Sequence, residues 1–261
     1  MNNKQSRWEV LGKLKTEDLI EILLKNRGIK SANERKEFFN PTHPEKLSLR
    51  TLGINQPQVR KAIERIKKAK KKGELVIVYG DYDADGICGT AILWERLYSL
   101  GVNTLPYIPE RFSEGYGLNA ESIKRLKEEN PELGLIITVD HGIVAASKVE
   151  TAKKLGIDVI ITDHHQPGKK EPKPLAMVHT IEIGGAAVAW ILAREMKPSS
   201  EGLELVAIGT LADQLPLIGA NRSFAKYGLE ALNTTQRVGL NALYQEAGIV
   251  KGDIVPYEVG F

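Results

Sequence analysis

From residue 75 onward, the chain alternates short apolar runs with amphipathic stretches. The amphipathic stretches fit helices at about 89–100, 120–129 and 145–155. The apolar runs are rich in β-branched residues and read as strands at 75–79, 104–108, 135–139, 158–162 and 176–178. Because apolar and polar positions do not alternate within these runs, both faces of each strand should be covered. The pattern therefore predicts an α/β fold in which a parallel β-sheet is flanked by helices.

The first 73 residues show helical periodicity without strand-like runs. Thr16 precedes an amphipathic stretch that Gly28 ends, and Ser31 with Glu34 has the sequence of a capping box. A third helix is predicted over 58–72. Its apolar face holds Val59, Ala62, Ile63, Ile66 and Ala69, and its other face holds Arg60, Lys61, Arg65, Lys67, Lys68, Lys70, Lys71 and Lys72. We therefore divide the chain into a helical N-terminal arm, 1–73, and an α/β domain, 74–261, whose C-terminal part is helical from Gly184 onward.

Charge supports the same division. The chain has 36 Lys and Arg against 33 Asp and Glu, a net charge of +3. Up to Gly73 there are 19 basic and 8 acidic residues, and the remainder has 17 basic and 25 acidic residues. A basic arm thus precedes an acidic body. Such an arm fits either a polyanionic partner or a solvated helix face, and charge alone does not decide between them.

Composition excludes several classes of protein. A single cysteine excludes an internal disulfide and a CxxC zinc site. No run of about 18 apolar residues is present, so no membrane-spanning helix is predicted. The first residues lack the apolar segment of a secretory signal. With 42% hydrophobic residues the chain can bury a core, and we expect a soluble cytoplasmic protein.

Acidic and imidazole side chains follow three of the predicted strands. They are Asp81, Asp83 and Asp85 after the first strand, Asp140 and His141 after the third, and Asp163, His164 and His165 after the fourth. The carboxyl ends of parallel strands meet at one edge of a sheet, where ligands bind. An Asp at such a position often caps a helix, which is the reading favoured for Asp163 taken alone. All three groups together favour a binding site.

The residue types at this edge indicate a metal. Carboxylates with imidazoles and no thiolate suit Mn²⁺ or Mg²⁺, although zinc stays open, and Cys88 is read as a packing residue. Several carboxylates can hold two ions about 3.5–4 Å apart, an arrangement that hydrolyses phosphoesters. A nucleotide-binding loop is the competing reading. The segment GDYDADG at 80–86 lacks both glycine-rich patterns of such loops.

Four ordered motifs resemble the DHH phosphoesterase superfamily. They are GDYDADG at 80–86, TVDHG at 138–142, TDHH at 162–165 and GTLADQLPL at 209–217. Segments 111–118, 184–194 and 221–222, together with the arm, resemble the RecJ family of single-strand-specific 5′→3′ DNA exonucleases. The likeness covers essentially the whole chain. Tyr79 stands where the pyrophosphatase and small-nucleotide phosphodiesterase branch has His, which also favours the RecJ family.

The resemblance implies a role for each motif residue. The metal ligands would be Asp83, Asp85, Asp140, His164 and Asp213, with Asp140 bridging two ions. Asp81, Asp163 and His165 would complete the catalytic site around the ligands or face the phosphate. Arg111, Tyr116, Asn221 and Arg222 would contact DNA. Without the resemblance, Asp213 reads as a solvent-facing helix end and Tyr116 as a turn residue. His141 stands where the family often has Asn, and it either touches the site or faces solvent.

The implied activity is two-metal hydrolysis of single-stranded DNA from a 5′ end, in DNA repair and recombination. Two alternatives stay open, a small-nucleotide phosphodiesterase or oligoribonuclease of the same superfamily and an inactive DNA-binding fragment. The family continues into a DHH-associated C-terminal domain and an oligonucleotide-binding domain, which we expect this chain to lack. We expect a monomer that binds single-stranded DNA and no membrane, with DNA-repair proteins as candidate partners.

Overall fold

The computed structural model describes residues 19–260, and the chain forms two compact units, 1–41 and 42–261. The basic helix predicted in the arm therefore lies in the same unit as the sheet. The reason is its apolar face, because Val59, Ala62 and Ile66 are buried in the core that covers one face of the sheet. The predicted helix start at Thr16 lies outside the described residues.

The first unit contains two short helices, α1 (Leu19–Asn26) and α2 (Ala32–Phe39). The capping box at the start of α2 is confirmed. Ser31 accepts a hydrogen bond from the Glu34 amide, and the Glu34 carboxylate accepts one from the Ser31 amide. These reciprocal bonds satisfy two amides that the first turn of a helix leaves without partners.

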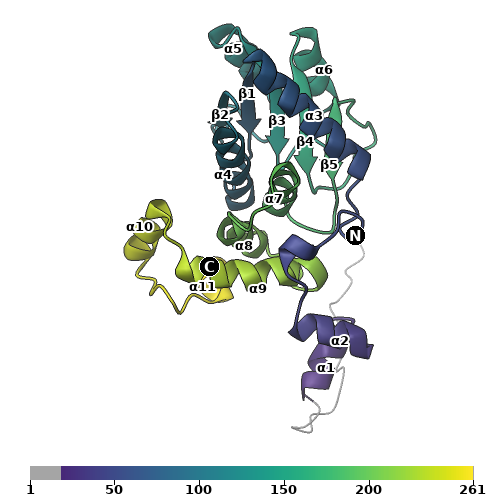
Figure 1. Ribbon diagram of the computed structural model, residues 1–261, viewed down its shortest axis with the longest axis vertical. Coiled ribbons are helices and arrows are strands. Elements are labelled where there is room, and N and C mark those ends of the chain that lie inside the picture. Colours follow the sequence, from purple (N-terminus) through teal and green to yellow (C-terminus); the bar gives the residue numbers. More distant parts are fainter. Residues whose placement is uncertain (1–18, 261) are drawn as a thin grey trace, which may run out of the picture. The chain divides into compact units, whose positions relative to one another are not determined.

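The second unit begins with a short 3₁₀ turn, Pro44–Lys46, and contains the remaining elements (Figure 1). Its strands are β1 (Leu75–Tyr79), β2 (Thr104–Tyr107), β3 (Leu133–Val139), β4 (Asp158–Asp163) and β5 (Ala176–His179). Its helices are α3 (Gln56–Lys72), α4 (Ala84–Ser99), α5 (Ala120–Glu129), α6 (Ala146–Lys154), α7 (Gly185–Met196), α8 (Leu203–Ala212), α9 (Gly219–Thr234), α10 (Val238–Ala247) and α11 (Pro256–Gly260). The expected α/β order and the helical C-terminal part are both confirmed.

The five strands form one parallel sheet in the order β2-β1-β3-β4-β5. Two cores cover its faces. One joins the sheet to α3, α4 and α7, and the other joins it to α5 and α6. Helices α8 and α9 pack beyond α4 and α7, so helical layers sandwich the sheet. Among residues 19–260, no helix is long and apolar enough to cross a membrane.

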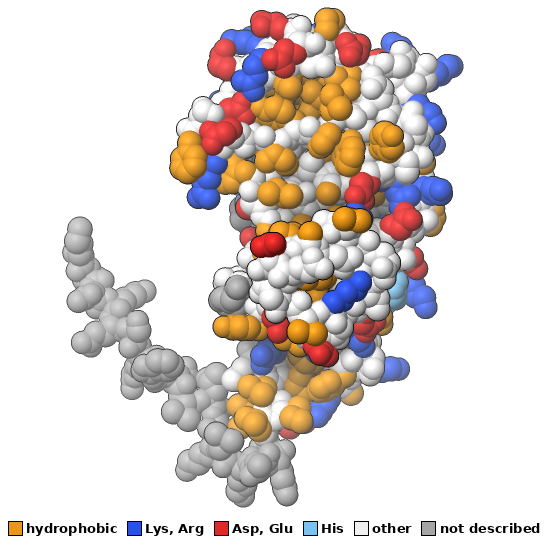
Figure 2. Space-filling view, turned by 90° about the vertical axis from the view of Figure 1, so that its left-hand side faces the viewer, with side chains coloured by type: hydrophobic (Ala, Val, Ile, Leu, Met, Phe, Trp, Pro, Cys, Tyr) orange, Lys and Arg blue, Asp and Glu red, His pale blue; other side chains and the backbone are white. Residues whose placement is uncertain are grey.

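The edge strands of the sheet are β2, which contains Pro106, and β5. Figure 2 looks onto the β2 side of the second unit, where hydrophobic side chains lie in patches among charged ones. Leu105 of β2 is 50% exposed and Thr104 is buried, so only part of this edge strand is covered. The more central strands β1, β3 and β4 are buried almost throughout, as their uninterrupted apolar runs predict.

Two local features differ from the sequence-based expectation. Helix α4 begins at Ala84 rather than near Gly89, because the Asp83 carboxylate caps it by accepting a hydrogen bond from the Gly86 amide at 2.8 Å. The sequence pattern places Arg65 on the solvent face of α3, but it is only 7% exposed. Its guanidinium donates to Asp158 and Glu74 at 2.6 Å each and to the Gly134 carbonyl at 2.9 Å. These partners compensate for the loss of water around a buried charge.

Candidate metal centre

The ends of three neighbouring strands bring the motif residues together. In the central strands Tyr79 pairs with Thr138, and Val139 pairs with Thr162. The turns that follow these strands therefore start at the same edge of the sheet. The gathering of Asp and His residues predicted from the sequence is confirmed.

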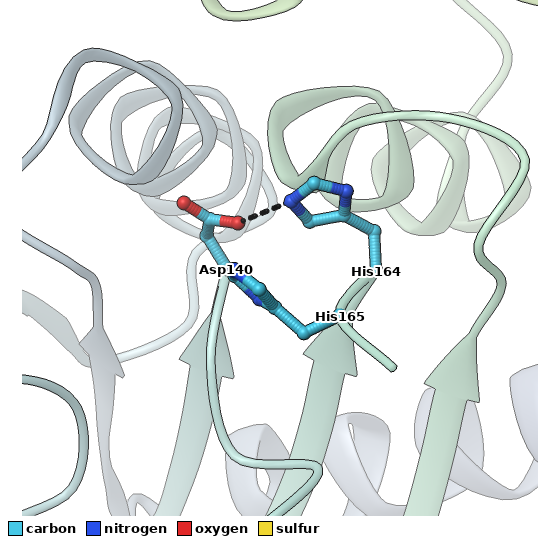
Figure 3. Close-up of side chains that lie close together, drawn as sticks. All are labelled: Asp140, His164 and His165. Carbon is cyan, nitrogen blue, oxygen red and sulfur yellow. Dashed lines mark ion pairs between the residues drawn. The ribbon is translucent and has the colours of Figure 1, made fainter. Parts of the chain in front are cut away.

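Three overlapping sets of side chains have ligand atoms within 4.8 Å of one another. They are Asp81 with Asp83 and Asp140, Asp140 with His164 and His165, and His164 with Asp85 and Asp213. His164 lies at the centre, because its Nε2 is 3.0 Å from Asp140 Oδ1 and 3.8 Å from an oxygen of both Asp85 and Asp213. Figure 3 shows Asp140 and His164 pointing toward each other from the ends of adjacent strands. Asp140 and His164 each belong to two sets and link all three.

Asp85 is held by the first turn of α7. Its carboxylate accepts hydrogen bonds from the Gly185 amide at 2.6 Å and the Ala186 amide at 3.0 Å. Burial raises the pKa of Asp85 to about 6, although these amides and His164 act in the opposite direction. The helix N-terminus thus favours the charged form that burial disfavours.

Two glycines make room for the carboxylates. A Cβ at Gly209 would collide with Asp85 Oδ1, and a Cβ at Gly185 would lie 2.6 Å from Asp140 Cβ. Any side chain at either position would displace a carboxylate from the cluster. This positioning role of the two glycines was not predicted, although Gly209 opens the fourth motif and Gly185 lies in the segment 184–194.

Asp140 is the most strongly perturbed acid of the cluster. Burial, followed by the charges of Asp85 and Asp83, raises its pKa to about 10. Its Oδ1 and the Oδ1 of Asp81 are buried without a hydrogen bond of proper geometry, despite the approach of His164. Crowded, partly unsatisfied oxygens of this kind are what a hard divalent cation binds. The donor set therefore fits Mn²⁺ or Mg²⁺.

Asp163 organises the third motif instead of capping a helix. Its carboxylate accepts hydrogen bonds from the amides of Ile143 at 2.8 Å and His164 at 2.7 Å, and from His165 Nδ1 at 2.8 Å. Burial opposes its ionisation, yet the hydrogen bonds prevail and lower the pKa of Asp163. The same bond raises the pKa of His165 and fixes its ring, as an outer carboxylate does beside a metal site.

His141 is buried beside the cluster and does not face solvent. It is 2% exposed, and its Nε2 donates to the Tyr79 carbonyl at 3.0 Å. Burial lowers the pKa of His141 to about 4, so the ring is neutral near pH 7. Of the two readings left open by the sequence, the solvent-facing one is wrong. His141 connects the end of β1 to the turn that carries Asp140.

Arg111, Tyr82 and Tyr116 lie one after another beside the cluster, and we call these three side chains the aromatic row. The Arg111 guanidinium lies 5.1 Å from the centre of the Tyr82 ring, which contacts Tyr116 edge-on. The Tyr116 hydroxyl is 3.3 Å from the Asp140 carbonyl and 3.5 Å from His165 Nε2. Phe112 is 92% exposed beside Arg111. Arg111 and Tyr116 were predicted as site residues. Tyr82 and Phe112 were not, although they lie within the motif at 80–86 and the segment 111–118.

The fourth motif contributes unequally. The Asp213 side chain is 37% exposed and is the C-cap of α8, yet it also lies beside His164. Asn221 is buried, and its amide donates to the Glu182 carbonyl at 3.1 Å. That bond ties α9 to the turn before α7. Arg222 follows on α9, and DNA contacts by these two residues stay predictions.

Carboxylates and imidazoles at the carboxyl edge of a parallel sheet define a metal-centre domain of the α/β class. The chain belongs to the DHH family, because the model described as "DHH family, N-terminal domain" matches residues 75–210. It is 38% identical over 254 residues to the single-stranded-DNA-specific exonuclease RecJ of Bacillus subtilis. The aligned region covers 93% of this chain and 32% of that protein. The chain thus spans about a third of this relative.

Solved structures agree with this assignment. A structure of exonuclease RecJ bound to manganese matches with a TM-score of 0.70 and 36% identity, over 78% of this chain and 55% of that one. RecJ from Thermus thermophilus in complex with Mg²⁺ matches with a TM-score of 0.57 and 27% identity, over 91% of this chain and 31% of that one. The chain is a RecJ-like N-terminal core, as its motifs predicted.

Proposed function

We propose that this chain is the catalytic core of an enzyme that hydrolyses phosphodiester bonds of single-stranded DNA from a 5′ end, using two Mn²⁺ or Mg²⁺ ions. The observation that carries the proposal is the sharing of Asp140 and His164 between adjacent sets of ligand atoms. A carboxylate common to two sets suits a pair of closely spaced ions. The substrate named for the Bacillus subtilis relative and the metals in the RecJ structures support it.

The residues of the cluster divide the work. Asp83, Asp85, Asp140, His164 and Asp213 would hold the ions, which when bound supply an activated water and charge stabilisation at the phosphoryl group. Asp81 and Asp163 would help to position these ligand side chains without binding the ions themselves. Asp163 fixes the ring of His165 through Nδ1, which leaves Nε2 beside Tyr116 at the mouth of the cluster. His165 is thereby placed to donate a proton or a hydrogen bond to a phosphate oxygen.

The aromatic row suits an unpaired strand. A guanidinium can bind a phosphate oxygen, and an exposed ring can stack on a base without regard to sequence. Arg111 and Tyr116 provide these groups next to the metal ligands, and their linkage through Tyr82 keeps them in order. In this proposal the 5′-terminal nucleotide lies along the row, and the phosphate that is cleaved lies at Asp140. Action in DNA repair, together with repair proteins, is part of the same proposal.

The other two readings of the sequence are not favoured. The RecJ relatives and structures argue against a small-nucleotide phosphodiesterase. Tyr79, at the position where that branch has His, is fully buried in the core. The intact set of ligand side chains argues against an inactive fragment.

Replacing Asp140 tests the proposal. Asp140 has a φ of 66°, a left-handed conformation that Asn tolerates, so Asp140→Asn removes the charge without forcing the backbone. We expect the rate at which nucleotides are released from 5′-labelled single strands in Mn²⁺ to fall on the order of 100-fold or more. Asp253→Asn removes an exposed carboxylate elsewhere and should retain activity. Equal activity of Asp140→Asn and the unaltered chain would refute the two-metal proposal.

A further inference from the structure

A cleft outside the metal centre lies along the free edge of β5. It has a volume of about 420 Å³ and lies between the start of α3 and the loop that precedes β5. Its lining is Asn55, Gln58, Lys61, Pro172, Lys173, Pro174, Leu175, Met177 and His179, with no acidic residue among them. Neither the motifs nor the proposed chemistry makes use of this cleft.

At the floor of the cleft, α3 is hydrogen-bonded to the edge strand. Gln58 Oε1 accepts a hydrogen bond from the Met177 amide at 3.0 Å, which occupies an amide of the strand's outer side. The apolar face of α3 is buried against the same part of the sheet. Figure 1 shows the first turns of α3 beside β5. Lys61 lines the cleft from α3, and Lys173 lines it from the loop.

The cleft begins where the metal centre ends. His179, one of its lining residues, pairs with Asp163 across the sheet, and its Nε2 donates to the His165 carbonyl at 2.7 Å. A strand advances about 3.3 Å per residue, so Met177 lies about 7 Å from His179 along the edge. One end of the cleft therefore lies next to the third motif.

We propose that this cleft binds the phosphate backbone of the single strand beyond the nucleotide at the metals, with Lys61 and Lys173 as the phosphate contacts. The proposal rests on the proposed function for the identity of the strand. Charge complementarity supports it, since two exposed cations face an acid-free cleft beside an acidic metal centre. Asn55, Gln58 and His179 offer neutral polar groups, which suits recognition of phosphate and sugar without regard to base.

The test compares two double variants of equal charge. Lys61→Ala/Lys173→Ala removes the cleft cations, and Lys67→Ala/Lys71→Ala removes two exposed cations from the other half of α3. Binding of a fluorescent 20-mer single strand is followed by anisotropy in EDTA, so that no hydrolysis occurs. We expect the cleft variant to bind roughly tenfold more weakly, and its dependence of log K on log salt to fall by about 1.4. The control variant should match the unaltered chain.

Hydrolysis with Mn²⁺ supplies a second measurement. In this proposal a dinucleotide occupies the metal centre without contacting Lys61 or Lys173. The cleft variant should therefore cleave it at the unaltered rate and lose activity only on the 20-mer. The inference is overturned if the cleft variant binds the 20-mer normally or if both double variants lose affinity equally. If the unaltered chain cleaves neither substrate, the proposed function fails. The anisotropy comparison then still decides whether the cleft binds the strand.

Discussion

Asp85 and Asp140 depend on neighbours that contribute no functional group. Gly209 and Gly185 matter because they lack a Cβ, which lets α7 and α8 come within contact distance of the two carboxylates. The precision of the metal centre therefore depends on residues that bind nothing. Such residues are absent from any inventory of ligands.

Gly209→Ala should disable the centre while preserving the fold. The new Cβ would push Asp85 away from the amides of Gly185 and Ala186, because the carboxylate is buried and has little room to adjust. We expect Mn²⁺ affinity measured by calorimetry to fall by about 10–100-fold. Gly239→Ala, where a Cβ meets nothing within 4 Å, should bind Mn²⁺ normally. Normal binding by both variants would show that the glycine has no positioning role.

Individual roles were only partly predictable from the sequence. The acids and imidazoles could be found because hydrophobic strands end directly before them, and this position implies an edge. The burial of Arg65 could not be found, because one guanidinium among many cations on a helix has no local signature. Its partners Asp158 and Gly134 come from distant parts of the chain. His141 was undecidable for the same reason, since Tyr79 is its partner only in the folded sheet.

The segment between β2 and α5, which carries Arg111 and Tyr116, is fastened by one carboxylate. Glu114 accepts hydrogen bonds from the Tyr107 hydroxyl at 2.6 Å, Ser122 Oγ at 3.0 Å and the Glu110 amide at 2.9 Å, and it is paired with Arg125. Burial acts against its charge, but these donors lower the pKa of Glu114 to about 2. Glu114 thus joins the segment that carries Arg111 and Tyr116 to β2 and α5.

Glu114→Gln should lower stability in a pH-dependent way. A carboxyl whose folded pKa lies below its unfolded value stabilises above the unfolded pKa and loses this effect as pH falls through the folded one. We expect the free energy of unfolding at pH 7 to fall by about 1 kcal/mol, because water screens this carboxylate, and the deficit to shrink between about pH 4.5 and pH 2. Urea unfolding at several pH values measures it.

Glu121→Gln supplies the comparison for this experiment. The Glu121 side chain is 79% exposed and lies on the neighbouring helix α5. The free energy of unfolding of this variant should therefore equal that of the unaltered chain. A deficit for Glu114→Gln that is constant from pH 7 to pH 2 would contradict the assigned role of the carboxylate.

Most elements could be predicted, because buried parallel strands read as uninterrupted apolar runs. Strand β1 and helix α5 have the predicted limits. The start of α4 was missed because Asp83 belongs to the acidic motif and also caps the helix. Gly86, inside α4, looked like a loop residue. A turn and a helix start that share residues cannot be separated by pattern alone.

The entire second unit has to tolerate the crowded acids of the metal centre. Burial and mutual repulsion raise the pKa values of Asp81, Asp85, Asp140 and Asp213 together. An acid whose pKa is raised on folding destabilises the fold increasingly as pH rises between its unfolded and folded values. Without cations the protein therefore keeps a functional arrangement at the expense of stability.

Thermal unfolding should expose this conflict. In EDTA, Asp140→Asn should melt above the unaltered chain, and the difference should be larger at pH 8 than at pH 5. About 1 kcal/mol of relief corresponds to about 2–4 °C. Addition of Mn²⁺ should raise the melting temperature of the unaltered chain, by about 2.7 kcal/mol of stability at a hundredfold excess over Kd, and reverse the order. Equal melting temperatures in EDTA would argue against the repulsion.

The division of the chain was the least predictable property. Composition shifts at Gly73, but the compact units meet at Pro41 and Thr42 because burial, and not charge, decides where α3 belongs. Its cations other than Arg65 remain exposed. The sequence therefore indicated correctly that a basic surface exists, and it misjudged which body carries most of it.

The two edges of the sheet also bear on self-association. A bare edge strand offers free amides to a strand of another molecule. On β2, Pro106 has no amide to offer, and on β5 the Met177 amide is already bonded to Gln58. Neither edge presents an unbroken row of donors. Both edges of the sheet therefore disfavour the edge-to-edge strand pairing through which β-sheet proteins aggregate.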